Sequence, residues 1–513
     1  MPSAVPPTPR TIAAWVRCIK TAYDRKDPRL LQEMLITNTS RVFKRRPMPA
    51  LRIEIQRNLH TRGVIENVIE KEMGEDWEWK GFTDLMVAYL WMIESANPNI
   101  LSQARPGWEA ECKIYFERMK DFMIALNAAY SHPNGAILSH SAMMSAKWCI
   151  RVGRYIDRID NDPRRKACQS LLNPLLRTFN LSLIGERTPY TMPGQMLKKS
   201  VAIDIGNYLF KLYNKLAETG LSRTVHGNLG NAGLPMQHPF YLNPTLCTYN
   251  YYSGLELMRD HSLLRASESL QSAYDICLPR FTRHRRKILI PLLACNVLIG
   301  KFPSLEILSR PEAAGLQDLF VPVCMAIRKG DFRAFRVALG IEGPEKWKRE
   351  WWTEQRLDML LEDRGDILIW RSLIRKIWLL TCSPEQKQHI IRIDDVVACA
   401  TALHQRQPED IDHRMSPSET SDPTSWWYRG SGTRLTRNQV EGIVLSLLDQ
   451  KLIRGYVVRQ SKDESTWLVL GKGSDPFPNV YQLLESRRPK DTGKPRIGGG
   501  GVIRMNGVRE IGA

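Results

Sequence analysis

The stretch that decides the fold runs from Tyr249 to Pro303 and reads YNYYSGLELMRDHSLLRASESLQSAYDICLPRFTRHRRKILIPLLACNVLIGKFP. Apolar residues recur along it at intervals of three and four, which is the period of an amphipathic helix. The pattern predicts three consecutive helices, at residues 246–260, 263–278 and 285–299. These helices set the fold class for the rest of the chain.

Small residues in the first two helices predict how closely they pack. Gly254 lies where a close crossing would need a missing side chain, and Ala266 and Ala273 alternate with larger residues in the second helix. Such alternation lets antiparallel helices approach each other, and a pair of about 34 residues is the repeat length of tetratricopeptide-like solenoids. Pro291 should bend the third helix, which stacks on this pair.

The same helical period extends through most of the chain and predicts an all-helical body. It is strongest at residues 85–93, 119–129, 142–156, 201–216 and 370–380. Glycine and proline interrupt the period most clearly at residues 224–244, where we expect a loop. We therefore place the main domain boundary in that loop, near residue 245.

The period changes toward the C-terminus. Helical patterns cover residues 390–403 and 438–450, whereas residues 452–458 and 466–470 are short runs of β-branched and aromatic residues separated by a polar turn. The order helix, helix, strand, turn, strand predicts a winged helix. A polar, proline-containing stretch at residues 405–436 interrupts it and is interpreted as a surface insertion.

These patterns predict an all-α protein with a small α+β module, in which a tetratricopeptide-like helical superhelix is followed by a C-terminal winged helix. At 513 residues the chain is long enough for several domains. The expected segments are a disordered N-terminus (1–9), N-terminal helical repeats (10–245), a second helical part (246–388), the winged helix with its insertion (389–484) and a disordered, basic, glycine-rich tail (485–513).

The chain is strongly basic, with 73 Lys and Arg against 54 Asp and Glu and a formal net charge of +19. This excess favours a nucleic acid, an acidic protein or an anionic surface as partner. The 10 cysteines form no C-x-x-C pair, which indicates reduced thiols in a cytosolic or nuclear protein. Because the longest nearly apolar run, residues 288–299, is too short to span a bilayer, no membrane insertion is expected.

The densest basic run begins just after Pro279, and no acidic residue lies between Pro279 and Phe302. These cations could follow the phosphates of a nucleic acid or grip an acidic subunit. An exposed helix start whose arginines pair with acids elsewhere would give the same pattern. The candidate phosphate-binding residues are Arg280, Arg283, Arg285, Arg286 and Lys287.

The winged helix is less basic than a module that reads DNA. Residues 437–472 carry six basic and four acidic side chains, and Glu441 and Asp449 on the second helix would repel a duplex. Sequence-specific reading of bases is therefore not expected. The residues of this module that could contact phosphates are Arg437, Arg454, Arg459 and Lys462.

The sequence contains no recognisable catalytic or cofactor pattern. It has no H-E-x-x-H, no metal-type spacing of Cys and His, and no G-x-S-x-G. The glycine-rich residues 227–233 lack both the lysine and the preceding strand of a phosphate loop. We therefore expect no enzymatic activity, no cofactor and no metal.

Several motifs together resemble one known family. They are Tyr251-Tyr252-x-Gly254-x-x-x-Met258, Ala266-x-x-x-Leu270-x-x-Ala273-x-x-x-Cys277, Arg286-x-Ile288-Leu289, Leu298-x-Gly300-x-x-Pro303, Lys329-Gly330-Asp331, Leu452-Ile453-Arg454-Gly455-Tyr456 and Asp475-Pro476-Phe477-Pro478. The pattern resembles the PCI-domain subunit of the TREX-two mRNA-export complex, the family of PCI-domain-containing protein two. A close relative of that family is the accessory PCI subunit of the COP-nine signalosome.

The resemblance implies a non-catalytic scaffold in the nucleus and at the nuclear pore, with some cytoplasmic protein. It implies a larger PCI-type subunit and a small acidic, disordered subunit shared with the proteasome lid as partners, and a shared surface for RNA or DNA without sequence preference. The alternative is a protein-only subunit of a signalosome-like or lid-like particle, whose winged helix pairs edge to edge with another. The expected partner contacts are Leu452, Ile453, Tyr456, Val458 and Trp467.

Overall fold

The computed structural model describes residues 9–38, 47–58, 62–74, 77–97, 107–184, 197–234, 240–382, 389–404, 435–459, 465–471 and 475–487. These residues divide into two compact units, the first extending to Tyr252 and the second beginning at Ser253. The division falls inside helix α13 (Asn243–Arg259), a few residues beyond the boundary expected near residue 245. Nearly all of the expected insertion, and the tail beyond residue 487, lie outside the described residues.

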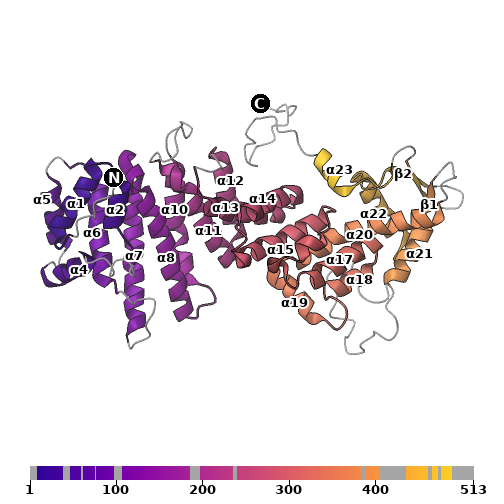
Figure 1. Cartoon of the computed structure of the whole chain (residues 1–513), viewed down its shortest axis with the longest axis horizontal. Coiled ribbons are helices and arrows are strands. Elements are labelled where there is room, and N and C mark those ends of the chain that lie inside the picture. The colour runs from indigo at the N-terminus through magenta and orange to yellow at the C-terminus, as the bar shows by residue number, and fades with distance from the viewer. Residues whose placement is uncertain are drawn as a thin grey trace, which may run out of the picture. The chain divides into compact units, whose positions relative to one another are not determined.

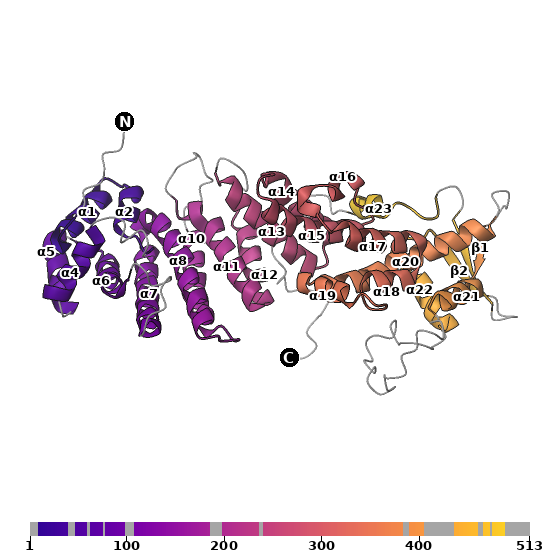
Figure 2. The same cartoon turned by 60° about the horizontal axis from the view of Figure 1, so that its bottom comes forward.

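The first unit is a row of helices in which chain neighbours pack against each other (Figure 1, Figure 2). Helices occupy the positions that the periodicity predicts at residues 85–93, 119–129, 142–156 and 201–216. The elements, including the 3₁₀ helices η1 and η2, are α1 (Ile12–Asp24), α2 (Pro28–Met34), α4 (Pro47–Asn58), α5 (Arg62–Met73), α6 (Lys80–Ser95), α7 (Trp108–Ser131), η1 (Pro133–Leu138), α8 (Ser139–Ile159), α9 (Lys166–Ser170), α10 (Leu172–Leu183), η2 (Lys198–Val201), α11 (Ala202–Leu216) and α12 (Thr219–Asn231).

Aromatic side chains fill the core of the first unit. Trp15 and Tyr89 are fully buried and stack with their ring centroids 5.5 Å apart. The buried hydroxyl of Tyr115 donates to the carbonyl of Thr37 at 3.0 Å and accepts the indole N–H of Trp148 at 2.9 Å. Because these polar atoms find partners inside the unit, the rings of Tyr115 and Trp148 are buried without leaving either donor unpaired.

The prediction of a loop at residues 224–244 is wrong for the first half of this range, because helix α12 continues through Gly227 to Asn231. Val225 and Leu229 lie one helical turn apart and are both fully buried. Leu229 packs on Gly206 of α11, where an added Cβ would lie 3.0 Å from the leucine Cδ1. Burial of this apolar face outweighs the low helix propensity of glycine.

The three helices that the opening stretch predicts are α13, in which the second unit begins, α14 (Leu263–Ile276) and α15 (Thr282–Leu298). The close crossing expected at Gly254 is confirmed, since a Cβ added there would lie 2.6 Å from Cγ of Leu270 on α14. Pro291 lies inside α15 and is buried.

The helical part of the second unit continues to α20. Its elements are α16 (Leu305–Leu308), the 3₁₀ helix η3 (Pro311–Ala313), α17 (Gln317–Lys329), α18 (Phe332–Ala338), α19 (Lys346–Gln355) and α20 (Asp358–Thr381). Gly330 ends α17 with φ +65°, and a Cβ there would lie 2.6 Å from the backbone N of Leu373 in α20, so only glycine allows both the turn and this approach. In the described part of the chain, no helix is long and apolar enough to cross a membrane.

A winged helix completes the second unit, as predicted (Figure 1). Its elements are β1 (Ile390–Arg392), α21 (Ile393–His404), α22 (Arg437–Asp449), β2 (Gly455–Arg459) and β3 (Thr466–Leu470). The strands form an antiparallel sheet in the order β1-β3-β2. β1 replaces the first turn of the helix predicted at residues 390–403, because a strand of three residues is too short to show an alternating pattern.

After β3 the chain returns to the helical part of the second unit. Arg371 of α20 donates to the carbonyls of Phe477 and Pro478, at 2.9 and 2.7 Å. The Phe477 ring lies 5.5 Å from that of Trp378, also on α20. The Asp475-Pro476-Phe477-Pro478 motif therefore fastens the end of the winged helix to α20.

Helix α23 (Val480–Ser486) extends this attachment to the end of α15. Val480 packs on Gly300, where an added Cβ would lie 3.1 Å from the valine Cβ. The Lys301 ammonium lies 3.4 Å from the centroid of the Tyr481 ring. α23 thus meets the motif around Gly300, and this helix extends to Ser486, past residue 485 where a disordered tail was expected to begin.

Candidate functional site

The predicted basic run surrounds the start of α15, and its cations point in different directions. Arg280, Arg283 and Lys287 are exposed and Arg286 is half-buried, whereas Arg285 is only 8% exposed. Successive residues of a helix are turned by about 100° from one another, so consecutive cations cannot share one face.

Arg285 is held inside the second unit by a network of polar contacts. Its Nε donates to Oε1 of Glu312 at 2.8 Å, and its Nη1 donates to the carbonyl of Cys277 at 2.6 Å. The guanidinium also stacks on the ring of Tyr274, 3.9 Å from the centroid, while the Tyr274 hydroxyl donates to the same Glu312 oxygen at 2.6 Å. Arg285 is therefore not available to phosphate, which corrects its prediction as a phosphate contact.

Glu312 balances this buried positive charge. Burial acts to raise the pKa of Glu312, but the hydrogen bonds from Tyr274 and Arg285 hold the pKa below its ordinary value. The neighbouring Arg286 donates to the carbonyls of Glu312 and Ala314, at 3.1 and 2.6 Å. The middle of the basic run thus ties the segment around η3 to α15, and its outer members are the ones that face solvent.

Two winged-helix cations that were predicted to contact phosphates are paired with acids. Arg437 lies 3.5 Å from Asp394, and Arg459 lies 3.6 Å from Glu441. Arg454 is exposed just before β2. Pairing reduces the charge that this module presents to a polyanion.

Helix α22, which occupies the position of a recognition helix, presents no cation among its exposed residues. Lys462, the remaining wing candidate, lies outside the described residues. The exposed residues of α22 are Asn438, Gly442, Leu445, Ser446 and Asp449. Such a face lacks the arginines and lysines that read guanine or hold phosphates.

The predicted partner contacts fall into two groups. Leu452 and Ile453 are 6% and 1% exposed, so the prediction for these two residues is wrong. Both donate their backbone N–H to the carbonyl of Leu447, at 2.9 and 3.3 Å, which folds them under the end of α22 before the strand begins. Tyr456 and Val458, by contrast, are 60% and 41% exposed.

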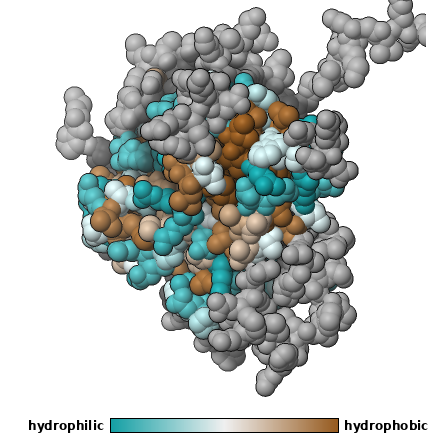
Figure 3. Space-filling model, turned by 90° about the vertical axis from the view of Figure 1, so that its right-hand side faces the viewer, coloured by the Kyte–Doolittle hydropathy of each residue, from teal (hydrophilic) through white to brown (hydrophobic). Residues whose placement is uncertain are grey.

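Tyr456 and Val458 lie on the outer face of the sheet with residues of β1 and β3. Tyr456 is paired with Val469 and Val458 with Trp467. Arg392 of β1 stacks over the half-buried Trp467 ring, 5.4 Å from its centroid. Figure 3, which looks at the end of Figure 1 where the winged helix lies, shows apolar residues exposed among polar ones. Aromatic residues and arginine are the types that dominate the energetics of protein interfaces.

The outer edge of β2 has no partner strand in the described part of the chain, since the sheet order places β2 at one side. Gly471 donates its N–H to the carbonyl of Arg454 at 2.9 Å, so Arg454 and Gly471 are a hydrogen-bonded pair. In an antiparallel ladder, hydrogen-bonded pairs alternate with pairs that make no hydrogen bond to each other. Gly455, Val457 and Arg459 therefore direct their backbone N–H and C=O groups away from β3. Such a row of donors and acceptors can pair with another strand.

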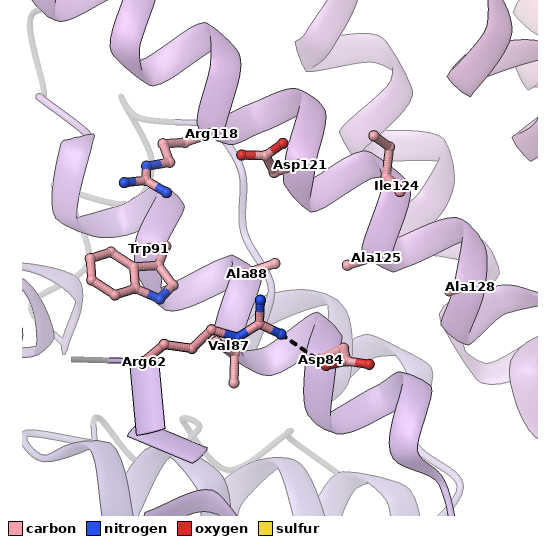
Figure 4. Close-up of a pocket in the computed structure, with 10 residues that line it drawn as sticks. All are labelled: Arg62, Asp84, Val87, Ala88, Trp91, Arg118, Asp121, Ile124, Ala125 and Ala128. Carbon is pink, nitrogen blue, oxygen red and sulfur yellow. Dashed lines mark hydrogen bonds and ion pairs between the residues drawn. The ribbon is translucent and has the colours of Figure 1, made fainter. Parts of the chain in front are cut away.

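The first unit contains a groove of about 620 Å³ between α5, α6 and α7 (Figure 4). Arg62 reaches across it to Asp84 at 3.2 Å, and Arg118 stacks on Trp91 with 5.1 Å to the ring centroid. Among the described residues that line the groove there is no histidine, cysteine or hydroxyl side chain. Among the described residues of the whole chain, no group of three His, Cys, Asp or Glu could hold a metal ion.

Comparison with known proteins finds relatives of one kind, although no protein-family model matches the chain. A PCI domain-containing protein of Schizosaccharomyces pombe is 25% identical over 435 residues, which are 83% of this chain and 85% of that protein. Protein CSN12 homolog of Neurospora crassa is 26% identical over 447 residues, 82% of this chain and 89% of that protein. PCI domain-containing protein 2 of Xenopus laevis is 24% identical over 281 residues, 55% of this chain and 58% of that protein.

These relatives agree with the architecture described above. Two of them match over more than four fifths of this chain, so the similarity reaches beyond the motifs around α13 to α15. The described fold, helical repeats that lead into a winged helix, is the one that the motif resemblance implies. Over most of its length the chain is thus similar to PCI-domain proteins of the type represented by PCI domain-containing protein 2 and CSN12 homolog.

Proposed function

We propose that this protein is a non-catalytic scaffold subunit whose winged helix docks another winged helix through the outer edge of β2. The observation that carries the proposal is the row of outward-facing backbone groups at Gly455, Val457 and Arg459, next to the exposed side chains of Tyr456 and Val458. Backbone pairing would supply affinity, and the side chains of the outer face would supply specificity.

We further propose that the complex is a nuclear mRNA-export assembly of the TREX-two type. Its larger PCI-type subunit would be the partner at β2, and a small acidic subunit shared with the proteasome lid would be a second partner. Support comes from the motif resemblance and from relatives named PCI domain-containing protein 2. The proposed location is the nucleus and the nuclear pore, with some cytoplasmic protein.

In this complex the second unit would contribute phosphate contacts without reading sequence. The exposed candidates that the structure leaves are Arg280, Arg283, Lys287 and Arg454. This assignment is consistent with the face of α22, which offers no exposed cation to base edges.

A second candidate function is a protein-only subunit of a signalosome-like or lid-like particle. Relatives named CSN12 homolog favour it. The same β2 edge would serve, because winged helices that pair edge to edge need no nucleic acid.

Val457→Pro tests the docking edge, with Val457→Ala as its matched control. Proline removes the outward N–H of residue 457 but no hydrogen bond to β3, and proline is tolerated at this kind of position on an edge strand. We expect Val457→Pro to abolish co-purification of the larger PCI-type subunit, while Val457→Ala retains it because the N–H remains. Undiminished co-purification by a folded Val457→Pro variant would sink the docking proposal.

The identity of the complex is tested by native purification of the full chain followed by mass spectrometry. Recovery of the export scaffold and the small acidic subunit supports the first proposal. Signalosome subunits without the export scaffold would overturn it in favour of the second candidate.

A further inference from the structure

The exposed face of α8 carries a continuous line of cations that lies outside every site described above. Lys147, Arg151, Arg154 and Arg158 are all exposed and are spaced by four, three and four residues. This spacing keeps them on one side of the helix over roughly 16 Å. Within the described part of the chain, none of the four forms a salt bridge with an acid.

A second row of cations from α11 widens this line. α8 and α11 pack against each other, and Lys211 and Lys215 of α11 are exposed. Arg165, in the turn after α8, donates to the carbonyl of Lys215. We call this surface the α8–α11 basic face and define it by Lys147, Arg151, Arg154, Arg158, Arg165, Lys211 and Lys215.

The pKa of Lys215 reports how closely these charges are gathered. Although the Lys215 side chain is exposed, the residues packed beside it partly desolvate its ammonium group and lower its pKa, and the positive charges of Arg154, Arg165 and Arg158 lower that pKa further. The pKa of Lys211 is likewise lowered by burial and by Lys147. Cations that repel one another in this way gain energy when a polyanion neutralises them together.

The acids around the face are engaged elsewhere or partly buried. Asp157 is buried and accepts two backbone N–H groups of α9, at 2.9 and 3.2 Å. Asp160 pairs with Lys113 at 2.9 Å. Asp204, which faces Lys211 and Lys147, is half-buried and accepts the hydroxyl of Thr245 at 2.7 Å.

The composition of the face favours a nucleic acid over an acidic protein. Protein interfaces need an apolar, well-packed centre, yet none of the exposed large apolar side chains in the described residues belongs to α8 or α11. Arginine, which forms two hydrogen bonds to a phosphate, supplies four of the seven cations. Tyr155 and Tyr208, both half-buried, stand beside these cations on the same helices and offer rings for base stacking.

We propose that the α8–α11 basic face binds the phosphate backbone of a single-stranded nucleic acid without reading its bases. The face lies wholly within the first unit, so this activity is separate from docking at β2 and from the cations around α15. Base recognition is not expected, because the face offers charge and rings more than hydrogen-bonding side chains matched to base edges.

The test compares two triple variants of the full chain that change the charge equally. Arg151→Glu/Arg154→Glu/Arg158→Glu alters the α8–α11 basic face, and Arg328→Glu/Arg375→Glu/Lys376→Glu alters exposed cations of the second unit that belong to neither proposed site. Binding of labelled 20-nucleotide poly(U) and poly(dT) is measured by fluorescence anisotropy over a series of KCl concentrations. Loss of three phosphate contacts should lower the salt slope by about two and the affinity by about 10-fold or more for the first triple only.

Each other outcome contradicts the proposal. An unchanged slope in the first triple shows that α8 does not touch phosphate. Equal losses in both triples show a diffuse effect of net charge. Polyglutamate that competes as well as the oligonucleotides, and whose binding the first triple also abolishes, would point to an acidic protein instead.

A milder variant separates binding from folding. Arg151→Gln/Arg154→Gln/Arg158→Gln removes the charges without reversing them, and it should keep the wild-type circular dichroism spectrum while still weakening binding. Both α8 triples should also retain co-purification with the partner at β2. Failure of the docking proposal and failure of this one are therefore distinguishable.

Discussion

The start of α15 and the exposed face of α8 each carry four cations within one helix. In α15 part of this charge is buried, whereas in α8 all of it faces solvent. In α15 the cations are nearly consecutive, so Arg285 turns inward to Glu312 while Arg283 faces solvent. In α8 they are spaced by whole turns and all stay on the surface. Density of charge along a sequence therefore does not measure the charge that a surface presents; spacing does.

The largest expected effect on stability comes from removing Glu312, the counter-charge of Arg285. Glu312→Ala leaves Arg285 buried without its counter-charge, which should lower the free energy of unfolding of the second unit by about 3–5 kcal/mol. Urea denaturation followed by tryptophan fluorescence measures the loss. Arg283→Ala is the control, because Arg283 is exposed and lies two residues before Arg285; it should change the free energy of unfolding by about 0.5 kcal/mol or less. Equal effects of the two variants would mean that Arg285 is not structural.

A smaller loss is expected at Arg286. Arg286→Ala removes the donor to the carbonyls of Glu312 and Ala314, and it should cost about 1–2 kcal/mol because these contacts are partly exposed to water. The same denaturation assay applies. A loss of stability as small as that of Arg283→Ala would mean that the hydrogen bonds of Arg286 do not stabilise the fold.

On α8, removing arginines should increase the free energy of unfolding, whereas on α15 it should decrease it. Arg154→Gln/Arg158→Gln relieves repulsion between like charges one turn apart, so the first unit should gain about 0.2–0.5 kcal/mol in its free energy of unfolding. Arg17→Gln is the control, because Arg17 pairs with Glu72 at 3.4 Å and its loss should not stabilise. Destabilisation by the double variant would show that these arginines hold contacts within the fold.

The weakest effect should appear as a pH dependence. Because partial desolvation and three arginines lower the pKa of Lys215 below 10.5, the unfolded chain binds more protons than the folded chain between the lowered pKa and 10.5. The first unit should therefore become more stable, relative to a Lys215→Gln variant, as the pH rises through that window. Thermal denaturation between pH 8 and 10.5 measures the difference in stability between the two proteins. A difference that does not change with pH would contradict the lowered pKa of Lys215.

Much of the fold could be predicted from periodicity, because apolar residues repeat at helical spacing wherever a helix buries one face. The winged helix could be predicted for the same reason, through the change of period after α22. β1 could not, because three residues carry no period, and without β1 the sequence does not reveal which edge of the sheet is open.

The candidate sites were harder to predict than the fold. The spacing from Lys147 to Arg158 is present in the sequence, and applying the helical period to charges as well as to apolar residues would have found it. The addition of Arg165 and Lys215 depends on how α8 and α11 pack, which no local pattern specifies. The burial of Leu452 likewise depends on where the strand begins.

The attachment of α23 to α15 has a consequence for how the protein is made. Val480 closes against Gly300, which leaves the ribosome about 180 residues earlier, so the second unit cannot complete its packing until translation has passed α23. Domains generally fold as units from the N-terminus during synthesis. The first unit can therefore be folded while α15, α20 and the β2 edge still wait for their C-terminal fastening, and a chain interrupted before residue 475 would carry an unfinished docking surface.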